Sequence, residues 1–207
     1  MQRSLFDPPP LERLGPESIV LRGLACDLPD LEAAVEAVIT AAPLRHMTVP
    51  GGGSMSVGTT SCGALGWCSD ARGYRYEPRD PLTGAPWPAM PEPLRRLATL
   101  AAARAGFAGY EPDSCLINRY RPRTKMGVHR DADERDFAWP IVSVSLGLPA
   151  TFVFGGLRRA DPVVRVPLEH GDVVVWGGVD RLRYHGVLPV KAGAGAYRTN
   201  LTFRRAG

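Results

Sequence analysis

A histidine and an aspartate two residues apart, His129 and Asp131, form the pattern in this sequence that best predicts chemistry. On an extended segment, residues i and i+2 point to the same side, so this imidazole and this carboxylate would lie side by side. His185, further along the chain, can bring a second imidazole to them from a neighbouring antiparallel strand. Two histidines and one carboxylate with open coordination positions are the ligand set of non-haem Fe(II) oxygenases. Zinc fits the same three ligands but has no redox chemistry.

The same His-x-Asp spacing occurs a second time, at His170 and Asp172. Here Gly171 and Asp172 form a dipeptide that is typical of tight turns, and Asp172 leads directly into the apolar run 173–176. We interpret this second pair as part of a turn between two strands. The first pair lies in the polar stretch 125–136, where a site can open to a substrate, so we take it as the metal-binding pair.

The composition is that of an ordinary globular protein. The chain has 207 residues, of which 44% are hydrophobic and 22% are charged, and these values predict one domain. A net charge of +4 does not by itself indicate a nucleic-acid partner. The four cysteines show no CxxC spacing, which argues against a structural zinc site. The sequence has no signal peptide and no long apolar run, so we expect a cytoplasmic protein with reduced thiols and no membrane partner.

The elements that must position these residues divide the chain into two halves. In the first half we predict a flexible arm over residues 1–16, followed by a single domain over 17–207. Two helices are expected there: one after a capping Asp30 and ending before Pro43, and one from about 91–93 to Gly106. A strand is expected at 18–24 before the first helix. Residues 43–90 are rich in Gly, Pro and aromatics without a helical period, so short strands and binding loops are expected.

From residue 115 onward the pattern is one of short strands separated by turn residues. The β-type runs are 115–120, 141–146, 151–154, 163–168, 173–176, 182–187 and 199–204. Several strands at this spacing without helices between them predict an antiparallel sandwich or jelly roll. We therefore expect an α+β fold that is mainly β, with two N-terminal helices packed on the β core.

The last predicted strand carries residues that suit an organic co-substrate. Alternation along a strand places Arg198, Asn200, Thr202 and Arg204 on one face. Two guanidinium forks on one face near a metal are suited to bind a dicarboxylate, one fork on each carboxylate.

Together with the segment 116–120 and several others, this strand closely resembles the corresponding parts of the AlkB family of Fe(II)/2-oxoglutarate dioxygenases, and above all of its bacterial members. The similarity runs from about residue 18 to the end of the chain, and the combination of motifs is far more specific than any one of them. The matching segments are 55–57, 65–67, 115–120, 140–149, 154–157, 168–178, 184–186 and 200–204.

The resemblance implies a double-stranded β-helix with a nucleotide-recognition lid at about 43–90 and a catalytic β core at about 115–207. It implies Fe(II) held by His129, Asp131 and His185, with 2-oxoglutarate and O2 as co-substrates. It implies a monomer that removes methyl groups from 1-methyladenine and 3-methylcytosine in single- or double-stranded DNA, with release of formaldehyde, succinate and CO2. The residues that would hold 2-oxoglutarate are Asn118, Tyr120, Arg198, Asn200 and Arg204.

Further residues are candidates for contact with the nucleotide. Base chemistry requires the base to leave the stack and enter a pocket, where the rings of Trp67 and His129 can sandwich it. Asp133 complements the charge of a methylated, cationic base. Phosphate contacts are expected from Tyr74, Arg75 and Tyr76, and a contact to the base or backbone from Arg159. On residue type alone, Trp67, Tyr74 and Tyr76 could equally belong to the core.

Two departures from the family pattern affect the expected substrate. Bacterial members usually carry Gln and Lys where this chain has Arg130 and Ala132, and their final hairpin is longer than residues 191–197 here. An RNA or tRNA demethylase of the same family therefore remains an alternative, because a pocket for a flipped base reports little about the sugar. The alternative outside enzymology is a metal-binding β-sandwich, which requires Arg198 and Arg204 to be structural.

Overall fold

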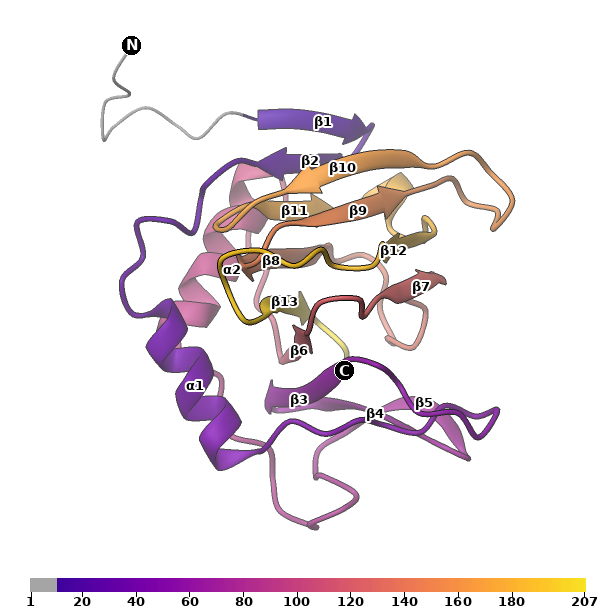
Figure 1. Ribbon diagram of the computed structural model, residues 1–207. Helices are drawn as coiled ribbons and strands as arrows, with labels where there is room; N and C mark the ends of the chain where they lie inside the picture. Colours follow the sequence, from indigo (N-terminus) through magenta and orange to yellow (C-terminus); the bar gives the residue numbers. More distant parts are fainter. Residues whose placement is uncertain (1–10) are drawn as a thin grey trace.

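Two antiparallel sheets face each other in the computed structural model, which describes residues 11–207 (Figure 1). The seven strands of the larger sheet lie in the order β1-β2-β11-β8-β13-β6-β3, and the four strands of the smaller sheet in the order β10-β9-β12-β7. A separate hairpin, β4–β5, lies beside the open end of this sandwich (Figure 1). This arrangement confirms the predicted mainly β, jelly-roll fold with two helices.

The bounds of the strands are as follows. The larger sheet consists of β1 (Leu11–Gly15), β2 (Ser18–Leu21), β11 (Val173–Trp176), β8 (Ile141–Gly147), β13 (Arg198–Arg204), β6 (Ser114–Tyr120) and β3 (Gly58–Gly63). The smaller sheet consists of β10 (Val164–Leu168), β9 (Ala150–Phe154), β12 (His185–Val187) and β7 (Met126–His129). The hairpin consists of β4 (Gly66–Asp70) and β5 (Gly73–Glu77), and a short 3-10 helix spans Gly178–Asp180.

Side-chain alternation gives the larger sheet two different faces. In β11, Val173 and Val175 pack in the core cluster that contains both helices, whereas Val174 and Trp176 pack in the cluster shared with the smaller sheet. Both faces are buried, which explains why this strand is apolar throughout. The helices therefore cover one face of the larger sheet, and its other face is left to form the interior of the sandwich.

The two helices lie where the sequence predicts them. Helix α1 (Leu31–Ala41) ends before Pro43, although Asp30 at its N-cap makes no side-chain capping bond. Helix α2 (Glu92–Arg104) is followed by Gly106, whose φ of 95° lies in the left-handed region that glycine tolerates. None of the described helices is long and apolar enough to cross a membrane.

The predicted flexible arm is wrong for residues 11–15. These residues form β1, which pairs antiparallel with β2, and a tight connection at residues 16–17 joins the two strands. Glu12 on this strand also forms an ion pair with Arg22, at 2.5 Å between carboxylate and guanidinium. Residues 11–15 contain none of the prolines on which that prediction rested and pair with β2, and the predicted arm over 1–10 lies outside the described residues.

Three other boundaries differ from the prediction. The lid region at 43–90 includes β3, which is an edge strand of the larger sheet paired with β6, so only the hairpin and its loops lie apart from the core. The run 182–187 is a strand only from His185, because the 3-10 helix and a turn at Arg183 precede it. The strand β7 was not predicted, since its four residues contain a glycine and a histidine and show little β propensity.

Candidate metal centre and its pocket

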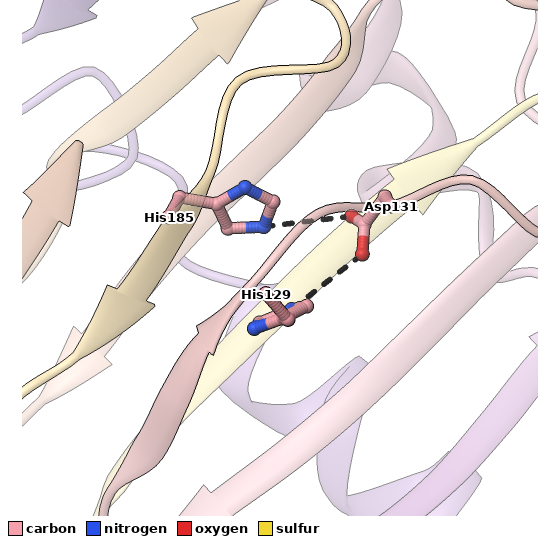
Figure 2. Close-up of side chains that lie close together, drawn as sticks. All are labelled: His129, Asp131 and His185. Carbon is pink, nitrogen blue, oxygen red and sulfur yellow. Dashed lines mark ion pairs between the residues drawn. The ribbon is translucent and has the colours of Figure 1, made fainter. Parts of the chain in front are cut away.

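Strand pairing brings the three predicted metal ligands together. In the smaller sheet His129 on β7 lies directly opposite His185 on β12, and Asp131 follows β7 by two residues. The Asp131 carboxylate lies 3.6 Å from Nε2 of His129 and 3.7 Å from Nε2 of His185 (Figure 2). One ligand atom of each residue lies within 4.8 Å of the others, so the three can bind one metal ion.

Backbone carbonyls orient both imidazole rings. Nδ1 of His129 lies 2.8 Å from the carbonyl of Gly127, and Nδ1 of His185 lies 3.0 Å from that of Arg183. A carbonyl can only accept a hydrogen bond, so Nδ1 carries the proton in each ring and Nε2 is left as the ligand atom. Burial, with the nearby His129, lowers the pKa of His185 to about 4, which keeps this ring neutral and able to bind a metal.

Asp131 is held in its charged form by Arg204. Burial alone would raise the pKa of the carboxyl, but the charge of Arg204 holds it well below its usual range. Arg204 donates to Oδ2 from both Nε (3.1 Å) and Nη2 (2.5 Å). Two imidazole nitrogens and one carboxylate oxygen are thus available together, and this donor set suits Fe(II).

A cavity of about 480 Å³ extends from these ligands into the interior of the sandwich. Alternation on β6 and β13 points a common set of side chains into it. That set consists of Asn118, Tyr120, Arg198, Asn200, Thr202 and Arg204. The predicted co-substrate residues therefore share one cavity with the metal ligands.

Arg198 is the residue that best identifies the ligand of this cavity. Its side chain is only 1% exposed and donates one hydrogen bond, from Nη2 to Ser145 at 2.9 Å. Nε and Nη1 have no partner, and no carboxylate of residues 11–207 lies within ion-pair distance of the group. Arg204 Nη1 and Asn118 Oδ1 in the same cavity are also without partners. A buried charge without a counter-ion is costly, so the free N–H donors of Arg198 and Arg204 fit a bound anion such as 2-oxoglutarate.

The mouth of the cavity carries four of the predicted nucleotide contacts, Trp67, Tyr74, Asp133 and Arg159. Trp67 stacks on Tyr74 with ring centroids 5.4 Å apart, and its Nε1 donates to Asp133 at 3.0 Å. An aromatic ring, a carboxylate and an exposed arginine thus surround the opening. These groups can stack on a base, neutralise a cationic base and bind a phosphate.

The other two predicted nucleotide contacts lie elsewhere. Arg75 points away from the cavity and pairs with Asp70 and Glu77, each at 2.8 Å. Tyr76 donates its hydroxyl to Glu134 at 2.9 Å. Neither side chain lines the cavity, so their positions do not support the predicted phosphate contacts.

Glu134 and Arg181 were not identified from the sequence. Both side chains are almost fully buried beside the metal loop, and their charged groups lie 3.1 Å apart. Glu134 belongs to the acidic stretch after Asp131, which is a weak signal, whereas nothing in the sequence around Arg181 distinguishes it from the other arginines.

The second His-x-Asp pair is structural, as predicted. His170 Nδ1 accepts a hydrogen bond from the Gly147 backbone at 3.0 Å. Asp172 is buried and accepts bonds from the backbone N–H groups of Gly23 and Glu169, each at 2.9 Å, and from Arg22 at 2.7 Å. Its carboxylate is fully used in joining the end of β2 to the turn before β11.

Comparisons with known proteins agree with this geometry. Residues 21–204 match the family model described as the 2OG-Fe(II) oxygenase superfamily. The chain is 53% identical to the alpha-ketoglutarate-dependent dioxygenase AlkB of Salmonella typhimurium over 94% of this chain and 93% of that protein. It is 51% identical to the protein of the same name from Escherichia coli over 95% of this chain and 93% of that one. Among solved structures, OsALKBH1 superposes with a TM-score of 0.82 at 28% identity, covering 95% of this chain and all (100%) of that one.

Proposed function

Because the chain belongs to the AlkB family within the 2OG-Fe(II) oxygenase superfamily, we propose that its cavity receives a methylated base flipped out of a DNA strand and oxidises the methyl group. The protein is an Fe(II)- and 2-oxoglutarate-dependent dioxygenase that acts on nucleic acid. The observation that carries the proposal is Arg198, a buried cation without a carboxylate partner among residues 11–207, in the cavity that also holds the His-Asp-His cluster. The bases 1-methyladenine and 3-methylcytosine in DNA are the proposed substrates.

Each group of the cavity has a proposed role. His129, Asp131 and His185 would hold Fe(II), and the free donors of Arg198 and Arg204 would bind 2-oxoglutarate. Asn118, Tyr120 and Asn200 would complete the co-substrate site from β6 and β13. The iron, with 2-oxoglutarate and O2, supplies the oxidising power that converts the methyl group to a hydroxymethyl group, which then leaves as formaldehyde.

The side chains at the mouth act by binding and orienting the base. Trp67 and the ring of His129 offer two aromatic surfaces, and stacking on such surfaces is worth about 1–3 kcal/mol per base. The Trp67–Asp133 hydrogen bond fixes the carboxylate that would face a cationic base. Arg159 and Arg130 both lie over the ring of Tyr184, with guanidinium carbons 6.0 and 5.8 Å from its centroid, and these two cations would contact the phosphates of the strand.

Turnover of a single-stranded oligonucleotide containing 1-methyladenine tests the proposal directly. With Fe(II), O2 and 2-oxoglutarate present, formaldehyde and succinate should form in equal amounts with the repaired base, and none should form without 2-oxoglutarate. His129→Ala should abolish turnover because it removes a metal ligand. His170→Ala is the matched control, since it removes a histidine from the other His-x-Asp pair, and it should retain activity.

An active His129→Ala enzyme, or succinate formed without base repair, would contradict the proposal. Competition between methylated DNA and RNA oligonucleotides of one sequence decides between the two nucleic acids, and preferential repair of RNA would replace the proposed substrate by its alternative.

A cytoplasmic monomer is proposed as well, in keeping with four cysteines that are all free thiols. Size-exclusion chromatography with light scattering tests the oligomeric state.

A further inference from the structure

The β4–β5 hairpin contacts the loop of the metal ligand Asp131 at two neighbouring points. Trp67 on β4 donates to Asp133 at 3.0 Å, and Tyr76 on β5 donates to Glu134 at 2.9 Å. Trp67 and Tyr76 lie directly opposite each other in the hairpin. Two register partners of the hairpin thus hold two neighbouring parts of the same loop. The first contact is at the cavity mouth, and the second leads into the protein interior.

A chain of alternating charges begins at this second contact. The Glu134 side chain is only 1% exposed, and its Oε1 atom, which accepts from Tyr76, also lies 3.0 Å from Nε of Arg204. Its Oε2 atom lies 3.1 Å from Arg181, which in turn donates to the backbone carbonyl of Asp131 at 3.1 Å. Arg204 completes the chain with its two hydrogen bonds to Oδ2 of Asp131. Two carboxylates and two guanidinium groups therefore balance each other's charge in a buried cluster, in which Arg204 Nη1 is left without a partner.

The order of these contacts defines which group positions which. Arg204 takes both of its hydrogen bonds to Asp131 on Oδ2, so the other oxygen, Oδ1, is left on the side of His129, 3.6 Å from its Nε2. Glu134 Oε1 lies 3.0 Å from the same Nε that donates to Asp131, so the charge of Glu134 helps to hold the guanidinium of Arg204 in this position. Glu134 in turn is held by Arg181 and by the Tyr76 hydroxyl. Burial raises the pKa of Tyr76 well above its usual value, so the hydroxyl stays protonated and remains a donor.

We propose that Tyr76 is a positioning residue for the metal centre, which acts through Glu134 and Arg204 on the carboxylate of Asp131. The inference rests on the proposed iron site and deepens it. Because Trp67 lies opposite Tyr76, the hairpin that would stack on the base is also the element that fixes the metal ligand. Seating of a base against Trp67 is thereby connected to the geometry at Asp131.

The test uses the full-length protein with Fe(II) and 2-oxoglutarate, without O2 and without nucleic acid. Tyr76→Phe removes one hydroxyl and keeps the ring. We expect the visible absorption band of the Fe(II)–2-oxoglutarate complex to shift, and the affinity for Fe(II) to fall roughly 3- to 10-fold. That is less than the 10- to 100-fold typical of direct partners of a ligand, because Tyr76 acts through two intervening side chains.

Ser69→Ala is the matched control. It removes another hydroxyl of the same hairpin, whose hydrogen bond at 2.6 Å goes to the Thr48 carbonyl and which lies outside the charged cluster. The band and the Fe(II) affinity should stay at wild-type values in this variant. Unchanged values in Tyr76→Phe, or equal changes in both variants, would overturn the proposal, because the second result would reflect only a loosened hairpin.

A double variant tests whether Tyr76 acts through Glu134. Glu134→Gln should itself change the band, and adding Tyr76→Phe to it should have little further effect, since the two act in one chain. Additive effects would show that Tyr76 acts by another route and would refute the relay. None of these measurements involves a base, so failure of the wild-type protein to repair 1-methyladenine would contradict the proposed substrate and leave this inference standing.

Discussion

At the scale of single residues, the most informative feature is that one arginine opposes stability while serving function. Arg198 is buried with two nitrogen atoms unpartnered, and burial lowers its pKa from the usual value. Neighbouring groups compensate only part of this cost, because its one hydrogen bond goes to an uncharged serine and its guanidinium carbon lies 5.2 Å from the centroid of the neutral Tyr120 ring. A residue kept in this condition is explained by a ligand that supplies the missing negative charge.

The substitution Arg198→Met therefore has two effects of opposite sign. The KM for 2-oxoglutarate should rise roughly 10- to 100-fold, because a charge-assisted hydrogen bond worth about 1.5–3 kcal/mol is lost. The ligand-free protein should be as stable as wild type or more stable, since methionine fills a similar volume without a buried charge. Steady-state kinetics and urea unfolding measure the two quantities. An unchanged KM, or a marked loss of stability in the ligand-free protein, would mean that Arg198 is a structural residue.

The sequence was sufficient to predict residues that the structure brings together, the His-Asp-His cluster and the face of β13 that lines the same cavity, and insufficient for the residues behind them. The spacing of His129 and Asp131 and the alternation on β13 are local patterns, and a local pattern can be recognised in the sequence without the structure. The pairing of Tyr76 with Glu134 joins residues 58 positions apart, and nothing near either one indicates the other. Tyr76 was accordingly predicted to face a phosphate, whereas its hydroxyl faces inward.

At the scale of elements, the two His-x-Asp pairs show how strand context decides the fate of one motif. The first pair ends a strand that opens into the cavity, and its carboxylate remains available to a metal. The second pair lies in the turn between β10 and β11. The Asp172 carboxylate accepts hydrogen bonds from backbone N–H groups of this turn and of the segment after β2. The turn dipeptide at 171–172 was the signal that separated them in the sequence.

Asp172→Ala should thus be a stability variant rather than a metal-site variant. It leaves two backbone donors and the Arg22 guanidinium without their acceptor, and the expected loss is about 2–4 kcal/mol in the free energy of unfolding. Urea denaturation measures this loss, and Fe(II) affinity of the folded variant should be unchanged. Asp30→Ala is the control: this carboxylate makes no capping bond at α1, and its removal should change stability by no more than about 0.5 kcal/mol. A weakened metal site in Asp172→Ala would contradict the structural role.

Elements were harder to predict where pairing, rather than composition, creates them. Strand β7 contains only four residues and gains its hydrogen bonds from β12, while β1 lies in a Pro-rich segment and exists because β2 offers an edge. In both cases the topology of the fold brings a partner strand alongside, and the β propensity of the residues themselves does not indicate that partner. The helices, by contrast, were predicted closely, because the residues at capping positions and the apolar spacing lie within the segment that forms the helix.

At the scale of the whole molecule, the proposed active site lies where the two sheets meet. His129 and His185 belong to the smaller sheet, whereas Arg198 and Arg204 belong to the larger one. A metal with its bound co-substrate therefore spans the sandwich and links strands that otherwise meet through side-chain packing. Such a ligand binds the folded protein and not the unfolded chain, so it must stabilise the fold.

This linkage predicts the response of thermal stability to the ligands. Without O2, Fe(II) and 2-oxoglutarate, each at about 100 times its dissociation constant, should add about 2.7 kcal/mol apiece and about 5.4 kcal/mol together, which corresponds to a rise in Tm of roughly 10–20 °C for a chain of this size. Calorimetry should show that the 2-oxoglutarate part of the rise falls to about half or less in Arg198→Met, because the affinity falls roughly 10- to 100-fold, while the Fe(II) part remains, since both histidines belong to the other sheet. If the substitution removed the Fe(II) part as well, the metal and co-substrate sites would not be separable, and the division of labour between the sheets would be wrong.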